Sequence, residues 1–427
     1  MKSKKFMLFA FMLLLVSSSL LSGCTRADPP NYADDTGATL EGVQTLVTAN
    51  NEFAITLYKE LSANTNENVF FSPYSISTAF SLTYEGARGE TANQLSSVFG
   101  FPQDPLVRLP NTARIYNEIN NNHKSYELST ANALWTQSQF PLNTTFVATA
   151  ERYYAANATA LDFATDPEAS RRKINAWVEA QTNGKIVDLL SEGVVTRDVM
   201  LILTNAIYFK ATWKDEFDKK RTHDARFFTS PEDEKMVSMM VLHKDANVNY
   251  MENDLLQMVE LPYEDEEFSM LVLLPQTRRP FDMLPSHNFT SMTLTDVKAS
   301  LSAENLSLWI SQLSSQEISV RLPKFTFETK YSLVKNFQNL GMVDPFNSDT
   351  ADFSYLSPYQ LYISDVIHQA VIEVDEKGTE AAAATVISTK LASAGRDFRA
   401  DHPFIFLIKE NTTGAIVFMG QVTDPTS

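Results

Sequence analysis

The chain has 427 residues, of which 44% are hydrophobic and 20% are charged, a composition typical of globular proteins. Its 35 Lys and Arg residues against 52 Asp and Glu residues give a formal net charge of −17, and so acidic a surface disfavours a nucleic-acid partner. With only 13 glycines and one cysteine, the chain can form no intramolecular disulfide, and glycine-rich nucleotide-binding loops are disfavoured.

The N-terminus has the pattern of a secretory signal. Lysines at the start precede an apolar run over residues 6–16, which is shorter than the roughly 20 residues that span a bilayer. The run leads into LSGC at 21–24, which resembles the lipobox of prokaryotic lipoproteins, and this resemblance implies cleavage after residue 23 and lipid attachment to Cys24. An ordinary secretory signal is the alternative. We therefore expect an extracytoplasmic protein, either a membrane-anchored lipoprotein or a secreted (extracellular or periplasmic) one, with residues 24–45 as a flexible tether.

Hydrophobic patterning predicts helices in the first half and strands in the second. In chain order we predict a helix over 46–61, a strand over 69–71, a helix over 75–84, strands over 132–136, 200–209, 268–274, 315–327 and 363–374, and a hairpin of 404–408 with 415–419. The run 200–209 is apolar on both faces, which predicts a central strand. No linker interrupts this order, so we predict an α+β fold in one domain over residues 46–427.

No enzyme motif is present. The chain has no G-x-S-x-G nucleophile motif and no H-E-x-x-H zinc motif, and its six histidines are scattered. Gly184-Lys185 does not end a phosphate-binding loop, because Glu179 stands where the first glycine is needed. We therefore predict a protein that is not an enzyme, with no catalytic residue, no metal site and no cofactor.

The segment 375–385 (DEKGTEAAAAT) stands out for its small residues. Its composition alone favours a surface helix or an alanine-rich linker. Its context favours another structure, because the predicted strand 363–374 runs straight into it and a polar stretch over 388–398 follows before the next strand. We therefore predict a long exposed loop between two strands.

This chain resembles the serpins, the serine protease inhibitor family. Besides the loop, the motifs that carry the resemblance are NVFFSPYSIS (68–77), TNAIYFK (204–210) with Trp213, RLPKFTF (321–327), LGMVDPF (340–346), DHPF (401–404) and FMG (418–420). The resemblance covers about residues 46–424. It implies three β-sheets, eight or nine helices and an exposed reactive-centre loop over about 376–400. In that family a protease cleaves the loop, and the loop then inserts into the largest sheet and traps the protease.

The loop sequence suits insertion. Thr379, Ala381, Ala383 and Thr385 share one parity and are small and uncharged, whereas Glu380 has the opposite parity and can face solvent. Bulky residues at the buried parity would cost about 1–3 kcal/mol each in a packed sheet. We therefore favour an inhibitor over a non-inhibitory serpin. A solute-binding lipoprotein is a further alternative, but the chain lacks the alternating βαβ order expected for one.

The resemblance also implies site residues, taken position by position. The family's buried polar cluster beneath the sheet, the shutter, corresponds to Ser72, Ser75, Asn205 and His368. The family's breach, at the top of the sheet, corresponds to Lys324 and Trp213. The hinge corresponds to Glu376, Lys377, Gly378, Thr379, Glu380, Ala381, Ala382, Ala383 and Ala384. A satisfied core histidine is the alternative for His368, and we expect Glu376 and Lys324 to form a surface pair with modest control of the sheet, about 0–1 kcal/mol.

Two counts implied by the family locate the reactive bond. About sixteen residues beyond Glu376 is Ala392, and about ten residues before Pro403 is Ser393. We therefore predict cleavage at Ala392–Ser393, with Leu391–Ala392 as the second choice. A small residue before the bond favours elastase-like or subtilisin-like serine proteases, whereas Leu391 would favour a chymotrypsin-like one.

The remaining expectations concern partners. Some serpins bind heparin through a basic helix near residues 105–125, but here that stretch offers only Arg108, Arg114 and Lys124. On so acidic a chain we predict no heparin partner. We expect a monomer whose partners are serine proteases and, through Cys24, a membrane.

Overall fold

The computed structural model describes residues 32–120, 126–156, 158–242, 247–277, 291–379 and 397–427. The folded unit runs from Tyr32 to Ser427. This differs from the expected tether, because Ala33 is already buried and the first helix begins at Leu40 rather than at residue 46. The reason is local: Asn117 brackets the backbone of Ala33 with two hydrogen bonds of 3.0 and 2.9 Å, and Asp34 pairs with Arg152 at 2.7 Å.

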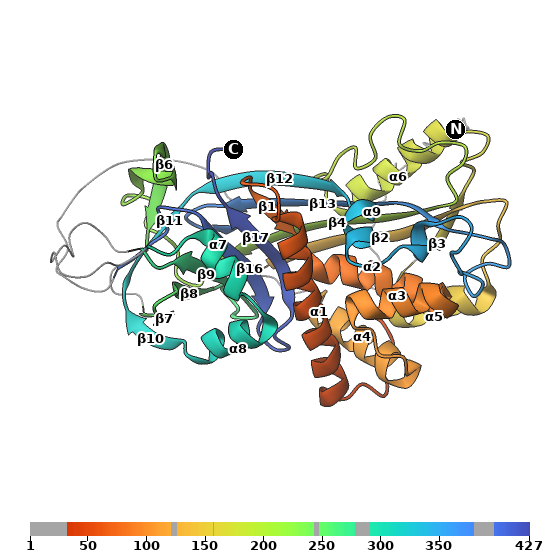
Figure 1. Cartoon of the computed structure of the whole chain (residues 1–427), viewed down its shortest axis with the longest axis horizontal. Coiled ribbons are helices and arrows are strands. Elements are labelled where there is room, and N and C mark those ends of the chain that lie inside the picture. The colour runs from red at the N-terminus through yellow and green to blue at the C-terminus, as the bar shows by residue number, and fades with distance from the viewer. Residues whose placement is uncertain (1–31, 121–125, 157, 243–246, 278–290, 380–396) are drawn as a thin grey trace, which may run out of the picture. The chain divides into compact units, whose positions relative to one another are not determined.

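Helices gather in the first half of the chain, as the patterning predicts (Figure 1). The described residues form α1 Leu40–Leu61, α2 Pro73–Gly86, α3 Gly89–Phe99, α4 Pro105–Ile119, α5 Thr144–Tyr154, α6 Pro167–Gln181, α7 Leu294–Ser300, α8 Ala303–Ser311, α9 Val334–Asn339 and the 3-10 turn η2 Asp344–Phe346. Their starts follow capping chemistry. The Ser72 hydroxyl accepts from the amide of Ser75, and Pro73 takes the first helical position, where no amide donor is needed.

Strands form three sheets in the described part of the chain. A seven-stranded sheet has the order β1 Val69–Phe71, β17 Ile416–Val422, β16 Phe404–Glu410, β9 Phe268–Pro275, β8 Leu256–Pro262, β7 Asn247–Glu252 and β10 Ser314–Glu317. A four-stranded sheet has the order β15 Asp397–Arg399, β11 Ser319–Pro323, β6 Asp233–Val241 and β5 His223–Ser230. A six-stranded sheet has the order β12 Phe325–Ser332, β13 Ile363–Val374, β14 Gly378–Thr379, β4 Leu201–Thr212, β2 Tyr126–Gln137 and β3 Ala158–Leu161.

The predicted strands are confirmed at their positions, with one subdivision: the run 315–327 spans β10, β11 and the start of β12, which belong to three different sheets. The strand β4 is buried over almost its whole length, as its apolar sequence predicts. The three sheets and nine helices of the described residues confirm the predicted α+β fold.

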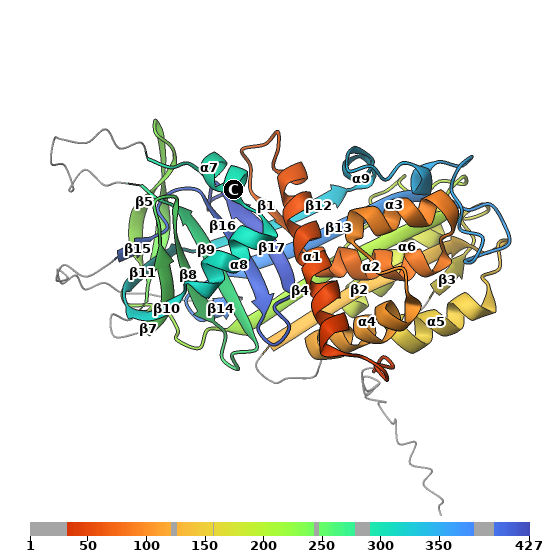
Figure 2. The ribbon, with the colours of Figure 1, turned by 60° about the horizontal axis from the view of Figure 1, so that its bottom comes forward.

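The six-stranded sheet is covered on both faces. Figure 1 shows α6 on one side of it and α1 to α5 on the other, and Figure 2 shows the four-stranded sheet at the end opposite α3 to α6. Beneath α6 lies an apolar cluster that includes Ile174 of the helix, Ile202 of β4 and Ile367 of β13. On the other face, Ile207 and Ile372 join the core shared with the seven-stranded sheet.

The strands β13 and β4 are neighbours in the six-stranded sheet, and we call the line between them the seam. These strands pair in parallel from Ile363 opposite Leu201 to Val371 opposite Tyr208. Beyond that point they separate, and the two residues of β14 lie between them. The seam is therefore closed along most of its length and already holds the start of an additional strand at one end.

Candidate functional site

The hinge begins with a tight turn at the end of β13. The Asp375 carboxylate accepts from the amides of Lys377 and Gly378 at 2.8 and 3.2 Å, and the Asp375 amide donates to the Gly378 carbonyl at 2.9 Å. Only glycine fits at position 378, since a Cβ there would overlap the carbonyl oxygen of Ala211. The turn thus sends the chain back along β4.

The first hinge residues lie inside the sheet. Gly378 and Thr379 pair antiparallel with Thr212 and Ala211 of β4, and Thr379 also faces Val374 of β13. The side chain of Thr379 is 1% exposed and its hydroxyl lies 3.0 Å from the Tyr263 hydroxyl. This corrects the expectation of an exposed loop over about 376–400, because Glu376, Gly378 and Thr379 near its start are buried. The hinge residues from Glu380 to Ala384 lie outside the described residues.

The breach pair is more buried than expected. Lys324 Nζ donates to Glu376 Oε2 at 2.8 Å, and the Thr222 hydroxyl donates to Oε1 at 2.8 Å. The Glu376 side chain is 6% exposed and that of Lys324 is 35% exposed, so this is not the surface pair that we expected. Burial of Glu376 disfavours its charge, but the hydrogen bonds from Lys324 and Thr222 outweigh burial and hold the pKa of Glu376 below its usual range.

Trp213 fastens the hinge backbone to the end of β4. Its indole N–H donates to the Asp375 carbonyl at 2.9 Å and its amide to the Lys377 carbonyl at 2.7 Å. The ring is 3% exposed and stacks on Tyr263 with centroids 4.6 Å apart. The amide of Phe217 donates to the Glu376 carbonyl at 2.8 Å. Each carbonyl from Asp375 to Lys377 is therefore held by an N–H from one short stretch after β4.

The shutter residues come together beneath the seam. The Ser72 amide donates to His368 Nε2 at 3.1 Å, and the other ring nitrogen, Nδ1, bonds to the Asn205 side-chain oxygen. Asn205 Nδ2 donates to the Ser75 hydroxyl at 2.6 Å and to Asn132 Oδ1 at 2.7 Å. Since Nε2 accepts a hydrogen bond, the proton of the neutral ring is on Nδ1. The cluster thus joins β13, β4, β2 and the start of α2.

Burial governs the charge of this cluster. It lowers the pKa of His368 to about 3, so the ring is neutral at ordinary pH. Asn205 and His368 are direct partners in the parallel register of β4 and β13, so their contact lies across the seam itself. A strand that entered the seam would have to break it.

The resemblance did not point to four residues that the structure adds to these clusters. They are Asn132 in the shutter and Thr222, Tyr263 and Phe217 in the breach. Asn132 lies in a β-prone run that reads as an ordinary strand. Phe217 and Thr222 lie in the connection between β4 and β5 and Tyr263 follows β8, and no local pattern in the sequence relates these two segments.

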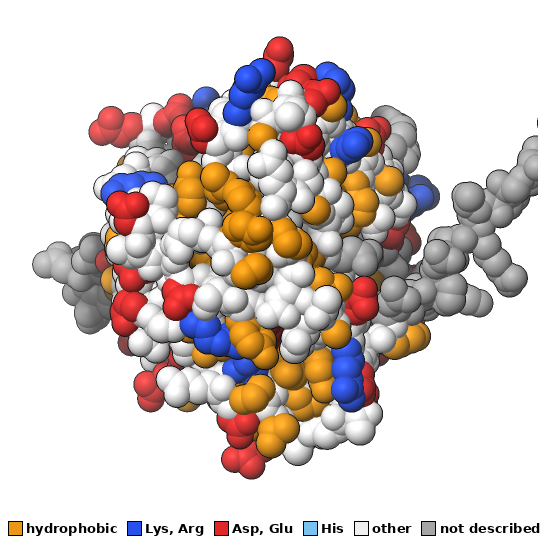
Figure 3. All heavy atoms as spheres, turned by 90° about the vertical axis from the view of Figure 1, so that its right-hand side faces the viewer, with side chains coloured by type: hydrophobic (Ala, Val, Ile, Leu, Met, Phe, Trp, Pro, Cys, Tyr) orange, Lys and Arg blue, Asp and Glu red, His pale blue; other side chains and the backbone are white. Residues whose placement is uncertain are grey.

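Several expectations concern residues outside the described part: the reactive bond Ala392–Ser393, Cys24 and Lys124. Within the described part, Arg108 is buried against Glu85 at 2.7 Å. Arg114 lies 3.4 Å from Asp35 and also pairs with Glu118. On the face in Figure 3, Lys and Arg side chains are scattered among acidic ones rather than gathered.

The described residues contain no group of His, Cys, Asp or Glu side chains that could hold a metal ion. A search for spans over the same part of the chain finds no helix with the length and apolarity needed to cross a membrane. At this site, backbone pairing and hydrogen bonds hold the first hinge residues between the ends of β13 and β4.

Relatives resemble this chain along most of its length. A protein named serpin-like from Methanosarcina acetivorans is 41% identical over 391 residues, which cover 89% of this chain and 88% of that protein. The leukocyte elastase inhibitor of Homo sapiens is 37% identical over 390 residues, which cover 90% of this chain and 100% of that protein.

Solved structures give the same result. Uncleaved ovalbumin superposes with a TM-score of 0.78 at 30% identity over 89% of this chain and 100% of the ovalbumin chain. Serpin48 of the insect Tenebrio molitor, described as highly specific, gives 0.76 at 28% identity over 89% and 98% of the two chains. The family model for serpin (serine protease inhibitor) matches residues 48–425. Given this coverage, the chain belongs to the serpin family.

Proposed function

We propose that this protein is an inhibitory serpin, a suicide substrate that traps serine proteases covalently by inserting its cleaved loop between β13 and β4. The observation that carries the proposal is the place of β14, whose two residues already lie in that seam in the antiparallel sense that insertion requires. The alternative within the family is a non-inhibitory serpin. The solute-binding alternative is set aside, because the fold is not that of such a protein.

The register of β14 supports the proposal from both sides of the seam. Continued one residue at a time along β4, the pairing of Thr379 with Ala211 brings Thr385 opposite Asn205. Continued along β13, the pairing of Thr379 with Val374 brings Thr385 opposite His368. The two registers agree, since Asn205 and His368 are themselves partners. A small residue with a hydroxyl would thus arrive where the shutter contact has to break.

The same register assigns faces to the loop residues. Ala381 and Ala383 fall opposite Phe209 and Ile207, whose side chains lie in the packed core. Small side chains suit this face, because larger ones would cost about 1–3 kcal/mol each. Glu380 falls opposite Lys210, which is exposed on the other face. The loop sequence therefore matches the environment of the seam residue by residue.

The trapping chemistry follows from an ordinary acyl transfer. The protease serine oxygen bonds to the Ala392 carbonyl carbon, the bond to the Ser393 nitrogen breaks, and that nitrogen leaves with a proton as the new N-terminus. Insertion then competes with hydrolysis of the ester. Trapping is decided by these two rates and not by an equilibrium affinity.

The target class rests on the reactive bond. Ala392 suits the shallow pocket of an elastase-like or subtilisin-like protease, and Leu391 would suit a chymotrypsin-like one. The similarity to a protein named leukocyte elastase inhibitor supports the first choice. The N-terminal pattern with Cys24 supports an extracytoplasmic location on a membrane or in the medium. The engaged Arg108 and Arg114 support the absence of a heparin partner, and a monomer suffices for the mechanism.

The test is to mix the purified protein with a subtilisin-like or elastase-like protease and analyse it on a denaturing gel. We expect a band at the summed mass and a released peptide that begins at Ser393. A protease whose catalytic serine is replaced by alanine is the control and should give no such band. Complete cleavage without complex would favour a non-inhibitory serpin. A peptide that begins at Ala392 or at Asp397 would refute the assigned bond.

A further inference from the structure

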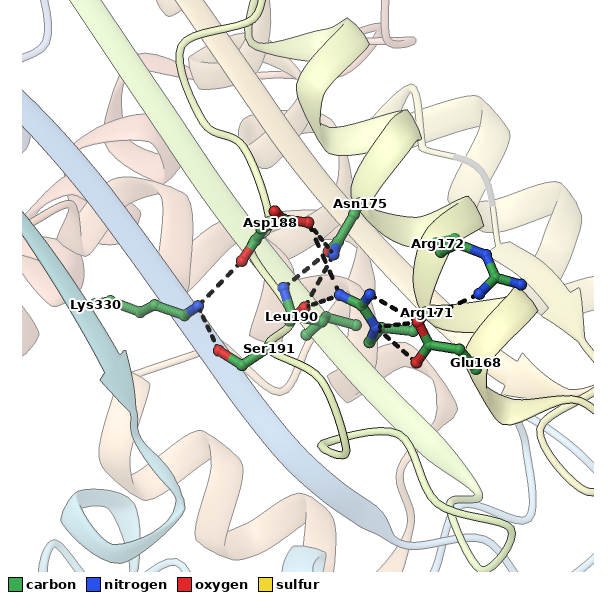
Figure 4. A network of polar contacts seen from close by, with 8 residues as sticks. All are labelled: Glu168, Arg171, Arg172, Asn175, Asp188, Leu190, Ser191 and Lys330. Carbon is green, nitrogen blue, oxygen red and sulfur yellow. Dashed lines mark hydrogen bonds and ion pairs between the residues drawn. The ribbon is translucent and has the colours of Figure 1, made fainter.

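The connection between α6 and β4 crosses the face of the six-stranded sheet. We name residues 182–199 the strap. Figure 4 shows the strap running over β4 and β13, with side chains from α6 on one side of it and Lys330 of β12 on the other. It has no regular secondary structure beyond turns, and Asp188 has a positive φ of 52°. Because the strap is not part of a helix or sheet, side chains of neighbouring elements that bond to its backbone help to fix its position.

Side chains of α6 hold one edge of the strap. Asn175, which is 6% exposed, donates to the Leu190 carbonyl at 2.9 Å and accepts from the Leu190 amide at 2.8 Å. Arg171 donates to the same carbonyl at 2.7 Å and pairs with Glu168 at 2.7 Å. The middle of the strap is therefore attached to α6 by three hydrogen bonds to the backbone of Leu190.

Lys330 holds the other edge. Its Nζ donates to the Asp188 carbonyl and to the Ser191 hydroxyl, each at 3.2 Å. Lys330 is on β12, opposite Gln369 of β13, so its side chain reaches over β13 to meet the strap (Figure 4). The contacts of Lys330 with Asp188 and Ser191 are named here the latch.

The underside of the strap spans the seam. Leu189 and Leu190 are fully buried in the apolar cluster that also holds Ile367 of β13 and Ile202 and Ala206 of β4. The strap therefore covers both sides of the line along which a strand would enter. The latch then ties it to β12, one strand beyond.

We propose that Lys330 is a positioning residue that slows opening of the β13–β4 seam by holding the strap across it. This inference rests on the proposed function, since opening matters only if a strand enters. An added strand would move β12 and β13 away from β4 by about 4.8 Å. Hydrogen bonds of 3.2 Å cannot span that shift unless the strap leaves α6 or the latch breaks. The latch is the more exposed tie, so it breaks first.

The test compares Lys330→Ala with two controls. Lys330→Arg keeps a cation long enough to reach the same acceptors. Arg172→Ala removes an exposed cation of α6 whose ion pair with Glu168 does not involve the strap. We expect Lys330→Ala to raise amide exchange at Leu190 about three- to tenfold, the effect of losing one or two exposed hydrogen bonds. Both controls should stay within twofold of the unaltered protein.

A second measurement follows sheet opening itself. On warm incubation without protease, the fraction that converts to a urea-resistant, loop-inserted form should grow about three- to tenfold faster in Lys330→Ala than in Arg172→Ala. Ser191→Ala should give part of this effect, and adding it to Lys330→Ala should give little more. Equal exchange and equal conversion in Lys330→Ala and Arg172→Ala would overturn the proposal.

The two failures are distinguishable. If the unaltered protein forms no covalent complex while Lys330→Ala still exchanges and converts faster, the proposed inhibition fails and the latch stands. If the unaltered protein traps protease but Lys330→Ala behaves like Arg172→Ala in both measurements, the latch fails and inhibition stands.

Discussion

Replacing Thr379 by arginine tests the insertion path at its first buried side chain. Thr379 is 1% exposed, lies between Val374 and Ala211, and contacts the Tyr263 hydroxyl. A larger side chain there costs about 1–3 kcal/mol of overpacking, and an unpaired guanidinium adds several kcal/mol of desolvation. In the uncleaved variant this cost is relieved when β14 leaves the seam and the arginine enters solvent, so insertion must then bury the arginine again. Even about 3 kcal/mol added to the barrier in this way slows insertion by about 100-fold.

The assay is the molar ratio of inhibitor to protease needed for full inhibition, measured together with the covalent band on a gel. Because hydrolysis of the ester then outpaces insertion, Thr379→Arg should be consumed as a substrate, with a ratio above ten. Glu380→Arg is the matched control, since it adds the same side chain one residue later at the parity that faces solvent, and it should stay close to the unaltered protein. A Thr379→Arg variant that traps protease at the unaltered ratio would refute the register.

Three further predictions concern the breach and shutter. Because burial lowers the pKa of His368 to about 3, the unfolded chain binds more protons than the folded one below pH 6.5. The free energy of unfolding should therefore fall by up to about 1.4 kcal/mol per pH unit as pH drops from 6.5 toward 3. Urea titrations at several pH values should show a weaker dependence of this free energy on pH in His368→Asn. Glu376→Gln should lose about 1–2 kcal/mol in the same assay, whereas Glu266→Gln, which breaks the exposed pair with Lys214, should lose less than about 1 kcal/mol; equal losses would contradict the role of burial. Asn132→Ala should cost about 1–3 kcal/mol, because the Ser75 hydroxyl and the Asn205 amide lose an acceptor, and an unchanged unfolding midpoint would exclude Asn132 from the cluster.

Local patterning was sufficient for the strands that were predicted, but it missed β3 and β5 to β8 and did not predict what surrounds any strand. The run 200–209 could be predicted as a central strand because its residues are apolar at both parities, and a strand covered on both faces needs that pattern. Residues 33–39 were wrongly predicted to belong to a flexible tether, because their own sequence carries no apolar pattern. They are short and polar, and what fixes them is a set of distant partners, Asn111, Asn117 and Arg152, that no local pattern predicts.

The clusters at the seam show a similar division. The resemblance supplied Ser72, Asn205 and His368 as members of one cluster, but nothing in the sequence separates Asn132 from other polar residues of a strand. Lys330 is a still clearer case. An exposed lysine on a strand is usually solvated, and only the path of the strap gives it a partner.

The contacts along the seam indicate that, in the proposed mechanism, the steps that limit insertion come after Gly378 and Thr379 have entered the sheet. Entry of a strand normally begins with an unfavourable nucleus, but here Gly378 and Thr379 already form that nucleus, held by Trp213 and by the ion pair of Glu376. What remains closed is the parallel pairing of β13 with β4, fastened beneath by the Asn205–His368 contact and above by the strap. Under the proposed function, a cleaved loop would therefore start insertion in a register that is already formed, and its rate of insertion would depend on how readily those two contacts break. Conditions that weaken the Asn205–His368 contact or the hold of the strap should make the uncleaved protein convert faster to the loop-inserted form. The same conditions should speed insertion of the cleaved loop after a protease attacks.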